Sequence, residues 1–230
     1  MRPADGSPAG FRNRRSLAVV EAGFDRLNAR HPWSHNDHFH PWILRHLPPR
    51  RGRALEVGCG RGRLVEQLAG RFGHVTAIDP DATMVASTRA RGLGNVEVLQ
   101  QSLLDTTGSF DLVTMVASLH HLPLETALPY AADLLAPGGR LLVVGLSRSG
   151  SPVDLAYDGI SLLLNPLVGM VKHPRVHRGG PTETEMPVKD PDHTFGELRD
   201  TAERLLPGVR VRHRLWFRYT LLWERPSSVE

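Results

Sequence analysis

The stretch Ala54-Leu55-Glu56-Val57-Gly58-Cys59-Gly60-Arg61-Gly62 decides the fold of this 230-residue chain. An apolar run leads through three alternate glycines into an amphipathic segment, a pattern that predicts a strand turning into a helix. Three alternate glycines cost more conformational entropy than a plain turn needs, so we expect a ligand close to the backbone there. A dinucleotide fingerprint would need a further glycine where the chain has Arg63, which argues against a nicotinamide-dependent dehydrogenase.

Outward from this motif, short apolar runs alternate with amphipathic stretches, which is typical of βαβ units around a parallel sheet. Strands are predicted at Arg53–Val57, His74–Asp79, Val96–Gln100, Phe110–Ala117 and Arg140–Gly145. Helices are predicted near Arg63–Phe72, Ala82–Arg91 and Thr126–Leu135, and, after a capping box at Thr194 and Glu197, up to about Leu206. The last runs, Val209–Leu215 and Arg218–Trp223, indicate a hairpin, so one strand should run antiparallel to the rest.

The composition, with 40% hydrophobic and 23% charged residues, is that of an ordinary globular domain. The net charge of +4 comes from scattered arginines, whereas a nucleic-acid surface needs clustered cations, so no nucleic-acid partner is expected. The single cysteine, Cys59, excludes an intramolecular disulfide and fits a cytoplasmic protein. The most apolar stretch, Gly159–Val171, is short and broken by Asn165-Pro166, so no membrane anchor is expected. The N-terminal stretch Met1–Ser16 is charged and is followed by no apolar core of signal-peptide length, so export is not expected either.

The motif resembles that of the class I S-adenosylmethionine (SAM)-dependent methyltransferases, acidic-x-G-x-G-x-G, which Glu56, Gly58, Gly60 and Gly62 match. The resemblance covers roughly residues 53 to 146. It implies an α/β, Rossmann-like fold with a mostly parallel seven-stranded sheet, one antiparallel strand and helices on both faces. It also implies SAM as cofactor, with the loop, Cys59 included, around the methionine portion and Glu56 organising the loop.

Asp79 ends the second predicted strand, where a carboxylate can accept both ribose hydroxyls of a nucleoside. The alternative role for such an acid is to stabilise a helix N-terminus, for which Asp81 is the better candidate. The resemblance adds Pro80 to the predicted SAM site and implies that Met84 packs near the adenine.

The third predicted strand ends differently from the family pattern. The family has Gly-Asp here, whereas this chain has Gln101-Ser102 followed by Leu103, Leu104 and Asp105. Ser102 can accept a hydrogen bond but carries no charge, so we expect adenine recognition to rest more on the backbone of Leu103.

The segment after the fourth predicted strand reads Leu119-His120-His121-Leu122-Pro123 and resembles the ubiquinone/menaquinone-methyltransferase-like branch of the family. Ala117, at the strand end, belongs to the predicted SAM site. His120 and His121 lie where the methyl group would emerge, and a neutral imidazole can remove a proton from a hydroxyl or amine. The alternative is that these histidines pack and hydrogen-bond locally.

A second histidine-rich segment, which contains His35, Asp37, His38 and His40, lies before the first strand. Its side chains suit a metal, but the spacing matches no defined motif and no metal is predicted. Proton transfer and capping of the SAM pocket are the other roles. We expect residues 1–50 to form a helical segment that caps the cofactor pocket. Residues 51–230 should then form the methyltransferase domain, with a substrate-lid insert at about 146–193.

Together these features predict methyl transfer from SAM to an oxygen, nitrogen or carbon atom of a small organic molecule, as in small-molecule biosynthesis. Holding donor and acceptor in line supplies most of such catalysis. The alternatives are a tRNA or protein methyltransferase, which would need a basic groove or peptide cleft, and a non-catalytic SAM-binding protein, which would bind SAM without turnover. The chain is expected to be a monomer or a homodimer.

Overall fold

The computed structural model describes residues 35–154, 156–157, 159–161 and 191–227. All of these but Ser161 belong to one compact unit. The predicted lid insert at 146–193 falls mainly on residues 162–190, and most of the predicted N-terminal segment on residues 1–34, so both lie largely outside the described residues.

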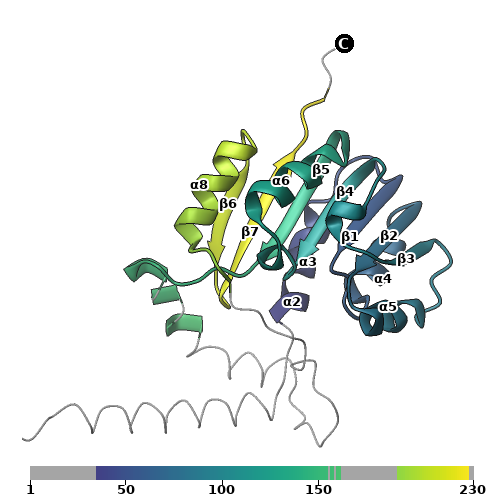
Figure 1. Ribbon diagram of the computed structural model, residues 1–230, viewed down its shortest axis with the longest axis horizontal. Coiled ribbons are helices and arrows are strands. Elements are labelled where there is room, and N and C mark those ends of the chain that lie inside the picture. The colour runs from purple at the N-terminus through teal and green to yellow at the C-terminus, as the bar shows by residue number, and fades with distance from the viewer. Residues whose placement is uncertain (1–34, 155, 158, 162–190, 228–230) are drawn as a thin grey trace, which may run out of the picture. The chain divides into compact units, whose positions relative to one another are not determined.

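The described residues form a seven-stranded sheet in the order β3-β2-β1-β4-β5-β7-β6 (Figure 1). The strands are β1 Arg53–Val57, β2 His74–Asp79, β3 Val96–Gln100, β4 Phe110–Val116, β5 Leu135–Gly145, β6 Arg210–Arg214 and β7 Arg218–Glu224. The first five run parallel, and β7 pairs antiparallel with both β5 and β6. The predicted fold class, with its single antiparallel strand, is therefore confirmed.

Helices connect the strands and cover both faces of the sheet. They are α2 His35–His38, α3 His40–Arg45, α4 Arg63–Ala69, α5 Ala82–Arg89, α6 Leu124–Asp133 and α8 Phe195–Leu205, with short 3-10 turns η1 Leu103–Asp105 and η2 Leu119–His121. The crossovers through α4 and α6 proceed in opposite directions along the sheet, so right-handed connection puts these helices on opposite faces. Thr194 caps α8 in the predicted box with Glu197, whose carboxylate accepts the Thr194 N–H at 2.8 Å.

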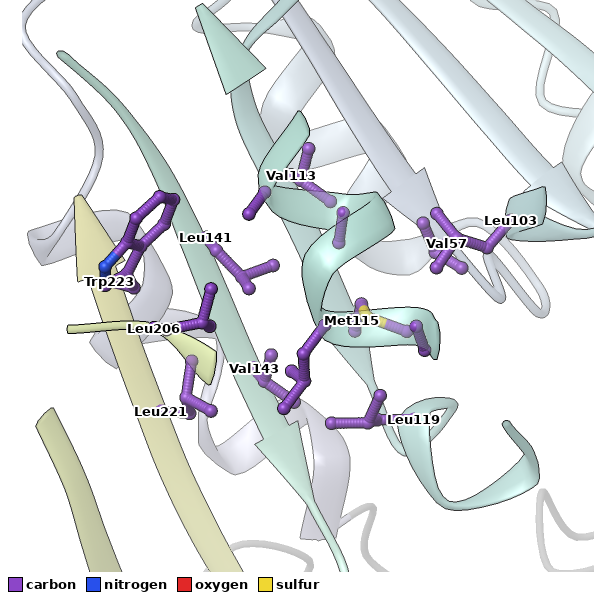
Figure 2. Packing of buried hydrophobic residues seen from close by; sticks show 14 of the residues in the cluster. Val57, Leu103, Val113, Met115, Leu119, Leu141, Val143, Leu206, Leu221 and Trp223 are labelled. Atoms are coloured by element: carbon purple, nitrogen blue, oxygen red, sulfur yellow. The ribbon is translucent and has the colours of Figure 1, made fainter. Parts of the chain in front are cut away.

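A hydrophobic core lies between the central strands and the α6 and α8 side of the sheet (Figure 2). Val113 and Met115 of β4, Leu141 of β5 and Leu221 of β7 are fully buried in it. Strands covered on both faces are apolar nearly throughout, which explains why the sequence of β4 reads as a continuous run. This core makes the sheet a rigid support for the loops at its edges.

The fifth strand begins at Leu135, so the predicted start at Arg140 is wrong. The Pro137-Gly138-Gly139 turn is absorbed into the strand as a register shift opposite Phe110 and Leu112. Gly139 makes this possible, because a Cβ there would lie 2.8 Å from the Ala136 carbonyl oxygen. The Pro-Gly-Gly sequence therefore indicates the irregular backbone correctly, but this irregularity lies within β5 and not between the preceding helix and β5.

Candidate functional site

The three glycines of the loop after β1 all adopt left-handed backbone. Gly58, Gly60 and Gly62 have φ values of 75°, 52° and 74°. The Gly58 and Cys59 N–H groups donate to the Ile78 carbonyl at 2.8 and 2.9 Å, which ties the loop to β2. A Cβ on Gly58 would lie 2.6 Å from the Cβ of Ser118, so only glycine allows this close approach of loop and β4 end.

Helix α5 supports the loop from the side through Thr88. The Thr88 hydroxyl donates to the Gly60 carbonyl at 2.8 Å and lies 3.6 Å from the Cys59 sulfur. A Cβ on Gly62 would lie 2.8 Å from that same hydroxyl oxygen. Burial raises the pKa of the Cys59 thiol to about 12, so Cys59 stays protonated and is no nucleophile at neutral pH. Sequence reasoning missed Thr88, because nothing in a helical threonine marks its partners.

Asp79 connects the end of β2 to the glycine loop. One oxygen of its buried carboxylate accepts the Gly60 N–H at 2.9 Å, and the other accepts the Asp81 N–H at 3.0 Å. A carboxylate offers about four lone-pair sites, so both oxygens retain capacity for further donors. Asp81 instead caps α5 by accepting the Thr83 and Met84 N–H groups. The structure confirms Asp81 as the helix cap, and the free lone pairs of Asp79 fit a pair of ribose hydroxyls, a role that stays a prediction.

Glu56 lies on β1 beneath the loop, only 2% exposed. The Thr114 hydroxyl of β4 hydrogen-bonds the Glu56 carboxyl group and also lies 3.2 Å from the Leu55 carbonyl. Burial raises the pKa of Glu56 to about 8, so the group is mainly protonated at neutral pH. The structure thus gives Glu56 a fixed partner, Thr114, that its motif did not indicate.

The turn after β3 brings a second acid to the predicted adenine contact. The Ser102 hydroxyl donates to the Asp105 carboxylate at 2.9 Å, and the Ser102 N–H donates to the same oxygen at 3.3 Å. Leu103 points its side chain into the core, where it is 1% exposed. Asp105 had no role in the predicted site, although the spacing Ser-x-x-Asp is a capping-box signal. Asp105 thus places a carboxylate beside the uncharged side chain of Ser102.

The end of β4 faces the glycine loop across neighbouring strands. Ala117 has a φ of 53°, which is unusual for a residue with a side chain. The next residue, Ser118, donates from its hydroxyl to the Val57 carbonyl at 2.7 Å and so fixes this end of β4 to β1. From β1 the chain crosses to β2 on one side, and from β4 it crosses to β5 on the other side. Open α/β sheets bind ligands at the carboxyl ends of two such neighbouring strands.

The histidine pair follows directly in η2. The His120 and His121 rings lie 4.0 Å apart between centroids, with His120 half-buried and His121 exposed. Both histidines follow the carboxyl end of β4. Whether either acts as a base stays a prediction.

The N-terminal histidines have separate environments. His40 is buried, its Nδ1 lies 3.0 Å from the Gln67 amide nitrogen of α4, and its Nε2 lies 3.6 Å from Asp37. Burial lowers the His40 pKa. His38 is exposed and meets the edge of the Trp216 ring, while His35 begins α2. Among the described residues no group of three His, Cys, Asp or Glu side chains is placed to hold a metal ion.

Comparison with known proteins agrees with this geometry. A family model described as a methyltransferase domain matches residues 54–139. The chain is 32% identical over 203 residues to an uncharacterized methyltransferase of Mycobacterium tuberculosis, covering 85% of this chain and 98% of that protein. It is 39% identical over 115 residues to a ubiquinone biosynthesis O-methyltransferase of Xanthomonas oryzae, covering 46% and 48%.

Solved structures share the fold. The DhpI-SAM-HEP complex has a TM-score of 0.57 at 23% identity and covers 94% of this chain and 99% of that chain. The N-methyltransferase NodS from Bradyrhizobium japonicum has a TM-score of 0.51 at 18% identity and covers 83% and 96%. The chain therefore belongs to the class I SAM-dependent methyltransferases and uses SAM as its methyl donor. In the part of the chain that the structure describes, no helix is long and apolar enough to cross a membrane.

Proposed function

We propose that this enzyme methylates an oxygen, nitrogen or carbon atom of a small organic molecule. One observation carries the proposal: at the carboxyl edge of the sheet, the Asp79 carboxylate after β2 accepts the Gly60 N–H of the glycine loop after β1. The ubiquinone biosynthesis O-methyltransferase, which this chain matches over about half of that protein's length, acts in the synthesis of a small molecule, and this supports a small acceptor. The basic residues of the chain are scattered in sequence, which argues against a nucleic-acid substrate.

SAM supplies a sulfonium-activated methyl group, and the residues described above would hold it. The backbone at Gly58 and Gly60 carries no side chain and has φ values of 75° and 52°, so the methionine portion of SAM can approach it closely. Asp79 accepts the ribose hydroxyls with its remaining lone pairs. Ser102 and Asp105 lie together after β3 and offer a hydroxyl oxygen and a carboxylate to the adenine amino group.

Catalysis in this proposal consists mainly of holding the acceptor in line with the methyl group. His120 and His121 follow β4 beside the donor site and are the residues from which we expect base assistance when the acceptor must lose a proton. The segment up to residue 50 would cap the pocket. Its support is that α2 reaches the ligand edge, where Asp37 pairs with Arg63 at the start of α4. The lid insert at 146–193 stays a prediction.

Asp79→Ala, with Asp81→Ala as matched control, tests the proposal by titration calorimetry with SAM. Hydrogen bonds to a charged group contribute about 1.5–3 kcal/mol, so Asp79→Ala should weaken SAM binding at least about tenfold. Asp81→Ala removes only a helix cap, so it should cost about 0.5–2 kcal/mol of stability and leave SAM affinity unchanged. Equal SAM affinity in both variants would show the ribose assignment to be wrong.

Turnover is tested separately with a panel of phenols, amines and carbon acids. Formation of S-adenosylhomocysteine with any of them supports the proposed small-molecule activity. SAM binding without turnover across the whole panel would favour a non-catalytic SAM-binding protein.

A further inference from the structure

Arg218, the first residue of β7, is a buried cation whose partners are all neutral. The residue is 8% exposed. Its Nε and Nη2 donate to the Asn36 side-chain oxygen at 3.3 and 3.0 Å, and Nη1 donates to the carbonyls of Trp216 and Phe217 at 3.4 Å each. Among the described residues no carboxylate pairs with it. Burial lowers the pKa of the guanidinium to about 10, so Arg218 keeps its charge at neutral pH.

This arrangement is unusual because buried charges are normally paired. The half-exposed Arg63 and Arg204 pair with Asp37 and Glu125 within 2.6 Å, although exposed ion pairs contribute little. Arg218 is more buried than these two arginines and so costs more to desolvate, yet its acceptors are only a side-chain amide and backbone carbonyls. Two of its contacts, at 3.4 Å, are long for hydrogen bonds. A neutral side chain would hold these carbonyls at a lower desolvation cost, so the positive charge needs another explanation.

The position of Arg218 supplies one. In the antiparallel pair of β5 and β7, Tyr219 lies opposite Gly145, the last residue of β5. Arg218 therefore lies just beyond the carboxyl end of β5, at the edge where open α/β sheets bind ligands. The SAM loop and Asp79 follow β1 and β2, on the other side of β4. Arg218 is thus on the half of this edge that the donor site leaves for the acceptor.

The hairpin that leads into Arg218 is strained. Trp216 and Phe217 both adopt left-handed backbone, with φ values of 65° and 57°. This conformation costs roughly 1–2 kcal/mol for each residue with a side chain. Strain of this kind persists mainly where the surrounding structure enforces it, and it concentrates at functional sites. Here it places the two carbonyls against the guanidinium.

We propose that Arg218 binds an anionic group of the methyl acceptor, a carboxylate or a similar oxyanion. The inference rests on the proposed small-molecule activity and narrows its substrate class to organic acids. The planar guanidinium matches the two oxygens of such a group, and an anion beside it would replace the long contacts from Nη1. The acceptor is then anchored at β7 with its reactive atom toward the glycine loop, so Arg218 positions the substrate and takes no part in proton transfer.

The first test needs neither a known acceptor nor turnover. Arginine side-chain Nε–H resonances of the full chain, saturated with S-adenosylhomocysteine, are followed by NMR while acetate is added at constant ionic strength. Acetamide serves as the neutral isostere. We expect a saturable shift of one resonance with acetate and none with acetamide. Arg218→Lys removes that resonance, and Arg210→Gln, at an exposed position of the same hairpin, leaves it. No saturable acetate response in the parent protein would overturn the proposal, whether or not the variants fold.

The second test identifies the source of the anion, since SAM also carries a carboxylate. Calorimetry of Arg218→Gln and Arg218→Lys with SAM should give Kd values within about threefold of the parent if the site belongs to the acceptor. A loss of tenfold or more in a folded variant would assign Arg218 to the SAM carboxylate and overturn the acceptor assignment. The proposed SAM site fails by a different result, namely unchanged SAM affinity in Asp79→Ala.

Discussion

Replacing Gly58 by alanine tests the close approach on which the donor site depends. Gly58 has a φ of 75°, and a Cβ there would lie 2.6 Å from the Ser118 Cβ, well inside the usual carbon contact of about 3.5–4.0 Å. Ser118 cannot easily give way, because its hydroxyl is bonded to the Val57 carbonyl at 2.7 Å. Gly92→Ala is the matched control, since Gly92 has a φ of 64° and open space around it.

The two variants share the backbone cost and differ in the collision. Left-handed backbone costs alanine roughly 1–2 kcal/mol in each. Overpacking against Ser118 adds roughly 1–3 kcal/mol in Gly58→Ala alone. We therefore expect Gly58→Ala to lower the free energy of unfolding by roughly 2–5 kcal/mol. Gly92→Ala should lower it by only the roughly 1–2 kcal/mol of the left-handed backbone.

Urea denaturation measures both losses, and calorimetry measures SAM affinity of the folded protein. Gly58→Ala should weaken SAM binding, because the loop must shift, while Gly92→Ala should not. Adding Ser118→Gly should restore part of the stability lost in Gly58→Ala by removing the atoms it strikes. Equal destabilisation by the two alanines, with no rescue, would refute the reasoning from close packing.

Three further predictions follow from buried groups and from the histidine pair. Burial raises the pKa of Glu56 from 4.5 to about 8, so between these pH values the folded state keeps a proton that the unfolded state releases. Urea denaturation should therefore show the free energy of unfolding falling as the pH rises from 4.5 to 8, and this fall should be smaller in Glu56→Gln. Gly145→Ala would place a Cβ 2.2 Å from the Tyr219 ring, so melts should show a loss of roughly 1–3 kcal/mol that Tyr219→Leu partly restores. If His120 or His121 is a base, its glutamine variant should lower the single-turnover rate about 10²–10⁴-fold at unchanged SAM affinity. If both glutamine variants keep rates within about tenfold of the parent, neither histidine is a base and catalysis rests on positioning of the acceptor.

Much of the fold could be predicted because its signals are local. The bounds of β1, β2 and β3 agree with the sequence patterns, and the alternate glycines lie in the predicted turn between β1 and α4. The start of β5 could not be predicted in this way. A Pro-Gly-Gly turn ends a helix, but whether the residues after it pair with β4 depends on the register of the whole sheet.

The sequence by itself determined the class of the protein, since alternate glycines, an acid after the second strand and the βαβ rhythm are short-range features of the backbone. Only the tertiary structure decided which side chains meet. Thr114 reaches Glu56 across 58 residues, Ser118 reaches Val57 across 61, and Arg218 reaches Asn36 across 182. Local periodicity does not encode such contacts, because they form only when strands and helices that are distant in the chain pack together in the folded protein.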